Sequence, residues 1–188
     1  MNRSVRLVSL LLPLVFLLMS CLPDRVGPDD VSYPITYRPT DIENVATVKV
    51  FTRSGSAWVE IPHDDTGFDD VVPFVLAPDI DQMRDLALFT DSTWQYIDGV
   101  SPVSLYEWDG TYFTFTLLAT AIFARGDYER FALHEFFLLT SRPDLPPAPA
   151  IVGSVDPDAD PFSKILEFIE EDVDTFAYQR YEVVYEAE

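Results

Sequence analysis

Two histidines and a run of acidic residues are the first groups in this sequence that could bind a metal ion. The stretch "IPHDDTGFDD" places His63 among four aspartates, and the second histidine, His134, stands beside Glu135. Two histidines and a carboxylate can bind zinc if the fold brings them together, but the spacing does not require it and no H-E-x-x-H motif is present. We therefore expect a solvated acidic loop and a strand histidine without a metal. Calcium contacts stay open for the four aspartates, Asp64, Asp65, Asp69 and Asp70.

A second acidic segment, "DPDADPFSKILE", has carboxylates at the spacing of a calcium-binding loop. Asp156, Asp158, Asp160 and Glu167 fall where an EF-hand loop places its ligands, but the position that needs glycine for a sharp turn is Pro161. The same residues are typical of a helix start, with Asp160 as the N-cap and Pro161 at the first helical position. We favour the helix cap and keep a calcium contact of another kind as the alternative.

Motifs for nucleophilic catalysis and phosphate binding are absent from the sequence. There is no G-x-S-x-G, and the seven glycines form no phosphate-binding loop. A carboxylate pair for glycoside hydrolysis can be chosen in any chain with 32 acidic residues, so the acids alone carry no argument for it. We therefore expect no enzymatic activity and no cofactor.

The aromatic residues could form a surface on which sugar rings stack. Trp58, Trp94 and Trp108 accompany nine tyrosines, and Trp108 precedes the Asp109-Gly110 pair. A tryptophan beside a hairpin more often packs across the strands. We therefore expect these rings in the core, with a glycan-binding platform as the alternative.

The single cysteine, Cys21, follows a segment with the three parts of a secretory signal peptide. Arg3 and Arg6 give a positive start, an uncharged apolar run extends from Leu7 to Met19, and the small Ser20 comes just before the cysteine. A helix that spans a bilayer needs about 18 apolar residues or more, so this run is too short for one. An unpaired cysteine in an exported protein also needs an explanation, because it can pair with other chains.

The residues "LMSC", Leu18 to Cys21, resemble the lipobox of bacterial lipoproteins. The resemblance implies that the Cys21 thiolate takes a diacylglycerol, that the signal peptide is cut before it, and that the new amino group is acylated. Two or three acyl chains anchor a protein stably, whereas one does not. Leu22 is not the aspartate that retains some lipoproteins in the inner membrane, so the resemblance favours the outer membrane.

The net charge of the chain excludes one class of function. With 12 basic and 32 acidic residues, the chain carries −20 at neutral pH. Such a surface repels phosphate backbones and anionic lipid headgroups, so we expect no nucleic-acid partner and no membrane adhesion apart from the anchor.

The composition predicts three segments: a signal peptide at 1–20, a lipidated cysteine and Pro/Asp-rich linker at 21–42, and a single β-rich domain at 43–188. Four prolines between Leu22 and Thr40 favour an extended linker, about 60 Å long at most. The alternative is that the second half, Tyr33 to Thr40, lies along the domain as an edge segment.

Alternating apolar residues predict hairpins in the domain. One joins Ala46–Thr52 to Ala57–Ile61. A second turns at Asp109-Gly110, for which we expect a type I′ turn, and sends alternate side chains to one face, namely Phe113, Phe115 and Leu117.

Further elements follow the same reasoning. Thr93–Ile97 reads as a short strand, and Glu129–Ser141 as a central strand with a helix as the alternative. Arg142–Pro161 reads as a proline-rich loop. A helix is predicted next by the spacing of five apolar residues, namely Ile165, Leu166, Phe168, Ile169 and Val173. The last predicted element is a strand, Ala177–Tyr185, which puts Tyr181, Val183 and Tyr185 on one face. The expected fold is mainly β, an antiparallel sheet or sandwich-like domain with one helix near the C-terminus, or an α+β arrangement.

These observations predict a non-enzymatic, membrane-anchored lipoprotein of the bacterial cell envelope, on the extracytoplasmic side, with a structural or protein-interaction role. Its partners would be the lipid bilayer, through acylated Cys21, and envelope proteins or glycans. The alternative is a glycan- or calcium-binding envelope module. A hydrolase ranks third, because it would need a cleft with two carboxylates or with both histidines.

Overall fold

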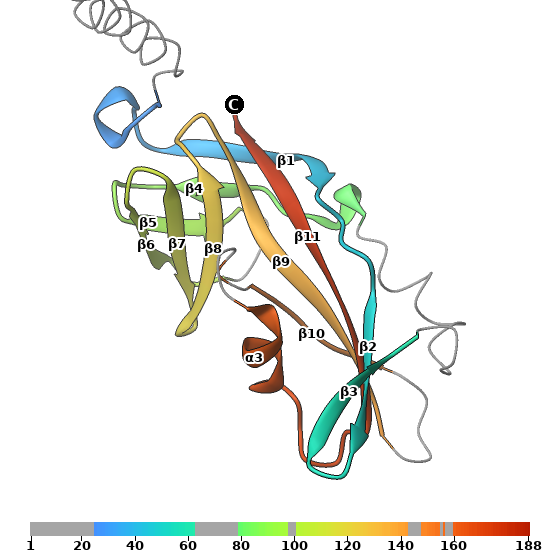
Figure 1. The fold of residues 1–188 in the computed structure, drawn as a ribbon. Coiled ribbons are helices and arrows are strands. Elements are labelled where there is room, and N and C mark those ends of the chain that lie inside the picture. The colour runs from blue at the N-terminus through green and yellow to red at the C-terminus, as the bar shows by residue number, and fades with distance from the viewer. Residues whose placement is uncertain (1–24, 63–78, 98–100, 143–147, 155, 157–159) are drawn as a thin grey trace, which may run out of the picture.

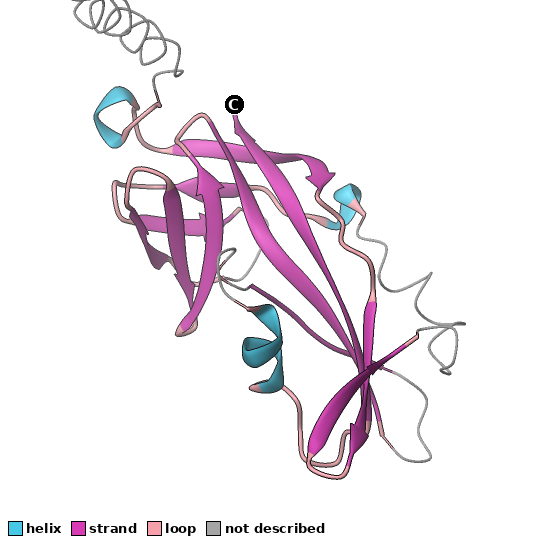
Figure 2. Ribbon diagram, in the orientation of Figure 1, coloured by secondary structure: helices cyan, strands magenta, loops and turns pink. Residues whose placement is uncertain are grey.

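The computed structural model describes residues 25–62, 79–97, 101–142, 148–154, 156 and 160–188. Eleven antiparallel strands make up a single sheet, with one short helix near the C-terminus (Figures 1 and 2). The strands are β1 (Ile35–Glu43), β2 (Lys49–Ser54), β3 (Ala57–Ile61), β4 (Leu86–Leu88), β5 (Thr93–Tyr96), β6 (Ser104–Trp108), β7 (Tyr112–Leu117), β8 (Thr120–Gly126), β9 (Arg130–Ser141), β10 (Ala148–Ser154) and β11 (Thr175–Ala187). The helices are α3 (Pro161–Leu166) and two 3-10 turns, η1 (Pro28–Asp30) and η3 (Ile80–Gln82).

Eight of the strands close into a barrel. The order β9-β8-β7-β6-β5-β4-β1-β11 returns to β9, because β11 pairs with β9 from Thr175↔Ser141 to Glu186↔Arg130. β9 and β11 are the longest strands, with 12 and 13 residues, and both run on beyond the barrel. Their extensions pair with β10 and β2 and form a second, open part of the sheet.

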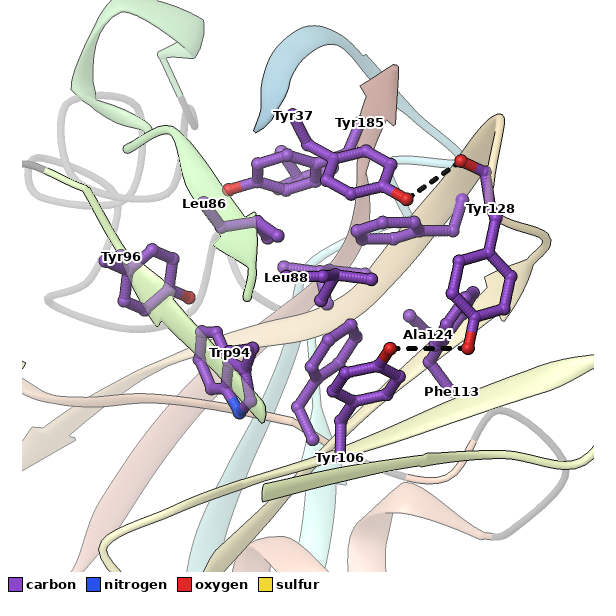
Figure 3. Packing of buried hydrophobic residues seen from close by; sticks show 14 of the residues in the cluster. Tyr37, Leu86, Leu88, Trp94, Tyr96, Tyr106, Phe113, Ala124, Tyr128 and Tyr185 are labelled. Carbon is purple, nitrogen blue, oxygen red and sulfur yellow. Dashed lines mark hydrogen bonds between the residues drawn. The ribbon is translucent and has the colours of Figure 1, made fainter. Parts of the chain in front are cut away.

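The barrel interior is filled by side chains rather than by solvent. Alternate residues point inward, as strand geometry requires, and aromatic rings dominate. Trp94 is 2% exposed and donates from Nε1 to the carbonyl of Thr116 at 3.3 Å. Figure 3 shows how the rings of Tyr37, Tyr106, Tyr128 and Tyr185 pack around Leu86 and Leu88, with the Tyr37 hydroxyl donating to the carbonyl of Tyr128 at 2.8 Å.

A second apolar cluster holds α3 against the open part of the sheet. Ile165 and Val173 pack on Phe136, Leu138 and Phe176. Asp160 caps the helix by accepting from the Phe162 N–H at 3.2 Å, and Pro161 is its first residue. The predicted helix start is therefore confirmed, although the helix ends at Leu166 and the residues after it continue as turns.

The predicted fold class is confirmed: the chain is mainly β and antiparallel, with one helix near the C-terminus. The β2–β3 hairpin, β5, the central position of β9 and the inward face of β11 also agree with the sequence. Among the described residues, no helix is both long and apolar enough to cross a membrane.

The Asp109-Gly110 hairpin is present, but the expected type I′ turn is wrong. Gly110 has φ +96°, whereas Asp109 is not among the residues with positive φ. Instead, the Asp109 carboxylate accepts from the N–H groups of Thr111 and Tyr112, both at 2.8 Å. Two consecutive residues with positive φ occur at the next turn, at Leu118 and Ala119.

Two segments that the sequence predicted to be a linker and a loop contain strands. β1 lies between β4 and β11 inside the predicted linker, so the boundary at residue 43 is too late; a bulge between Pro39 and Asp41 absorbs the proline. β10 lies inside the predicted loop 142–161 and has a bulge between Pro149 and Ile151. The alternative for Tyr33 to Thr40, that this segment lies along the domain, is therefore closer to the structure than the linker, although β1 has a partner on each side and is not an edge. The sequence did not predict β10, because proline usually ends a strand.

Candidate functional site

Glu135 lies where a core residue is expected. On β9, Phe131 and Leu133 fill the barrel, and Glu135 continues the same line of alternate residues. It stands directly opposite Tyr181 of β11, which is itself buried. The strand pattern therefore brings a carboxyl group to the end of the barrel interior that is nearer to α3.

A cavity of about 330 Å³ opens above this carboxyl group; we call it the Glu135 cavity. One side comes from Arg84 and Tyr96. The other sides are apolar or small and come from β7, β8, β10 and the turns after α3, namely Leu117, Leu118, Thr120, Ile122, Gly153, Ser154 and Phe168. The cavity thus has an apolar wall and a few polar groups, which is the usual composition of a ligand site.

Burial changes the acidity of Glu135. It raises the pKa of the carboxyl group from 4.5 to about 7, against the hydrogen bond with Tyr181 and the positive charge of Arg84, which both lower it. Burial also raises the pKa of the Tyr181 hydroxyl. The Arg84 guanidinium lies over the Tyr96 ring, with Cζ 4.0 Å from the ring centroid. Glu135 therefore changes its protonation near neutral pH.

This arrangement could bind a hydrogen-bond donor or transfer one proton. Glycoside hydrolysis needs two carboxyl groups across the scissile bond. Among the described residues that line the cavity, Glu135 is the one carboxyl group. The geometry thus supplies half of the pair on which the hydrolase hypothesis depends.

His134 takes no part in the cavity. It lies on the opposite side of β9, is 7% exposed, and places Nδ1 3.2 Å from Oε1 of Glu182. The other histidine, His63, lies outside the described residues, as do Asp64, Asp65, Asp69 and Asp70. In the described part of the chain, no three metal-binding side chains gather.

The other predicted site residues fall in separate places. Asp160 is the helix cap, Asp156 is exposed, and both Asp158 and Cys21 lie outside the described residues. Glu167 pairs with Lys164 on the surface.

The three tryptophans do not form an exposed row. Trp58 packs edge-on against Phe176 at 4.9 Å between ring centroids, and Trp94 is in the barrel core. Trp108 is half-buried and donates from Nε1 to the Gly126 carbonyl at 3.2 Å. The platform that the sequence left open as an alternative is therefore not built from these rings together.

Comparison with protein-family models, with curated protein sequences and with solved structures finds no match to this chain.

Proposed function

We propose that this chain is a non-enzymatic lipoprotein of the bacterial cell envelope, anchored through acylated Cys21, whose barrel acts through contact with another protein. The signal-like segment and the "LMSC" residues support the anchor. The filled barrel supports a role as a rigid body with functional surfaces on its outside.

The start of the described chain supports a short tether. Arg25 donates from Nη1 to the Gly110 carbonyl at 2.6 Å and to Thr111 Oγ1 at 2.8 Å, on the β6–β7 turn. Val26 and Val31 pack against the barrel core. Only a few residues separate Cys21 from this attachment, so the anchor would hold the barrel within about 15 Å of the bilayer.

Three exposed aliphatic residues, one in β6 and two next to the ends of β5 and β6, carry the protein-contact proposal. Ile97, Val103 and Leu105 are 51%, 59% and 63% exposed, and Leu105 lies opposite Thr93 in the sheet. We call these three residues the β5–β6 patch. Exposed aliphatic side chains that gather on one face of a soluble domain mark an interaction surface more often than isolated ones do.

The anchor is tested by Cys21→Ser in cells labelled with palmitate. We expect the wild-type chain to take up the label and to sediment with membranes. The variant should be unlabelled and should lose the membrane fraction or keep the signal peptide. A variant that is still processed and still sediments like the wild type would overturn the anchor.

The contact surface is tested with a photo-crosslinking amino acid placed at Leu105 in intact cells. A matched probe at Arg125, exposed on β8, is the control. We expect one discrete adduct from position 105 and none from 125, and the protein identified in it should stop co-purifying with Leu105→Glu but not with Arg125→Glu. Equal adducts from both positions, or none from 105, would contradict the proposal.

The Glu135 cavity favours a second candidate, the binding of a small ligand with an apolar body and one hydroxyl donor. The test is ligand-observed NMR with a set of small alcohols and phenols. The NMR binding signals of compounds that bind in the Glu135 cavity should weaken when the wild-type protein is replaced by Glu135→Gln. Signals that are the same in the variant and the wild type would exclude this candidate.

A further inference from the structure

A second cavity lies at the end of the barrel where the N-terminal segment attaches. Its volume is about 590 Å³, and its lining includes residues of η1, the β4–β5 loop and the aromatic rings around them. The rings are Tyr33, Phe89, Trp108 and Tyr128, and the carboxylates are Asp29 and Asp91. We call this the aromatic cavity.

The rings of the aromatic cavity are held in place by the barrel. Trp108 meets Tyr128 edge-on, with centroids 5.2 Å apart, and its Nε1–H is used by the Gly126 carbonyl. Tyr128 is 2% exposed and meets Tyr33 edge-on at 6.5 Å. Phe89 is 42% exposed, so this residue is also open to solvent.

The tyrosine hydroxyls here have partners within the protein. Tyr106 donates to the Thr90 carbonyl at 2.9 Å, because a carbonyl can only accept. The Tyr106 oxygen lies 3.4 Å from the Tyr33 hydroxyl and 3.3 Å from the Tyr128 hydroxyl, the second contact being visible in Figure 3. With the Tyr106 proton on the Thr90 carbonyl, the Tyr33 and Tyr128 hydroxyls can both donate to the Tyr106 oxygen, which leaves their lone pairs for a ligand.

The polar side chains of the cavity thus favour one sign of charge. Asp29 and Asp91 accept hydrogen bonds, as do the oxygens of Tyr33 and Tyr128. Among the described residues that line the cavity, no lysine, arginine or histidine occurs. Aromatic faces attract cations, and rings combined with carboxylates are the usual recognition of substituted ammonium groups.

We propose that the aromatic cavity binds a small organic ammonium cation, with its alkyl groups against Trp108, Tyr33 and Phe89 and its charge facing Asp29 and Asp91. A neutral sugar fits less well, because it would find acceptors for its hydroxyl protons but few side-chain donors for its oxygens. A phosphate next to the ammonium group would meet two carboxylates. The ligand is therefore a free ammonium compound rather than a lipid headgroup.

The test compares choline with its uncharged carbon isostere, 3,3-dimethylbutan-1-ol, by isothermal titration of the full chain in detergent at constant ionic strength. The two probes have the same shape, so the difference between them reports the charge. We expect choline to bind at least about tenfold more tightly. Equal affinity for the two probes, or binding of methyl glucoside in place of choline, would overturn the proposal.

Charge variants connect the binding to this cavity. Asp91→Asn and Asp29→Asn should each weaken choline binding about threefold or more, since each removes one facing charge while keeping the side-chain shape. Asp81→Asn is the matched control, because Asp81 is exposed on η3 outside the cavity and has the same charge. A loss of binding that is equal in the control would show a general charge effect and contradict the site.

Phosphocholine distinguishes a free ammonium compound from the ammonium group of a lipid headgroup, which carries a phosphate beside it. If the ligand is a free ammonium compound, phosphocholine should bind more weakly than choline, because Asp29 and Asp91 repel the phosphate. Tighter binding of phosphocholine would contradict the free-ammonium assignment.

Discussion

Glu135 connects the stability of the barrel to pH. Its folded-state pKa, about 7, is higher than the ordinary value of 4.5, because burial disfavours the charged form. Below about pH 4.5 the carboxyl group is protonated in both the folded and the unfolded state, so its ionisation does not change the free energy of unfolding. As pH rises towards 7 the unfolded chain releases this proton first, so the free energy of unfolding falls, and above pH 7 the loss is complete.

Glu135→Gln should remove this pH dependence. The shift corresponds to roughly 3 kcal/mol, so the variant should gain up to that amount over the wild type between pH 4.5 and pH 8. Urea unfolding at both pH values measures the difference. Glu107→Gln, which replaces an exposed carboxylate on the outer face of β6, is the control and should show little gain. A pH-independent difference for Glu135→Gln would show that the carboxyl group is not buried as described.

The sequence does contain a signal for Glu135. In β9 the apolar positions Phe131 and Leu133 set a two-residue period, and Glu135 falls on it. A carboxylate on the buried face of a central strand is unusual enough to mark a candidate site. Arg84 and Tyr96 could not have been placed beside it, because their positions depend on closure of the barrel.

At the scale of elements, the β7–β8 turn is strained. Leu118 and Ala119 have φ +49° and +67°, a region that glycine and asparagine occupy far more readily. Leu118 is also 79% exposed and lines the rim of the Glu135 cavity. The strain and the exposure occur together at a cavity rim, as is common at functional loops.

The double change Leu118→Asn with Ala119→Gly should stabilise the protein by about 1 kcal/mol, since both new residues adopt positive φ at low cost. Thermal unfolding measures the effect. Ala121→Gly, two residues further along in β8, should have the opposite sign, because its backbone is an ordinary strand. A destabilised turn variant would show that the leucine contact outweighs the backbone strain.

Elements with a clear period or turn residue were predictable, and elements without one were not. The β6–β7 hairpin was predictable because Gly110 marks its turn, and β11 because its tyrosines and valines alternate. The β7–β8 turn has no glycine, and β1 and β10 contain prolines that local rules assign to loops. Closure into a barrel depends on pairing between distant strands, which local patterns do not contain.

For the whole molecule, charge is the dominant long-range term. The chain carries −20, and the surface ion pairs neutralise only part of it; Arg130, for example, meets Glu43 at 2.8 Å and Glu186 at 3.3 Å. Self-repulsion of this kind destabilises the compact state and is screened by salt.

Salt should therefore raise the melting temperature. As sodium chloride rises from about 0.05 M to 0.5 M, we expect the melting temperature to increase by roughly 2–4 °C for each kcal/mol of electrostatic repulsion that the salt screens. Calorimetry at constant pH measures it. An unchanged or lower melting temperature would show that the carboxylates are spaced well enough for their repulsion to be negligible.

The pairing of β1 with β11 has a consequence for how the chain folds. Thr40 and Val184 meet across an interval of 144 residues, and β11 also supplies the partner for β9 and β2. β1 therefore has no hydrogen-bonded partner on its β11 side until β11, which comes last in the chain, has folded onto it. Such high contact order makes folding slow, so a newly synthesised chain would spend that interval with unpaired edges, at the stage when chaperones and proteases compete for it.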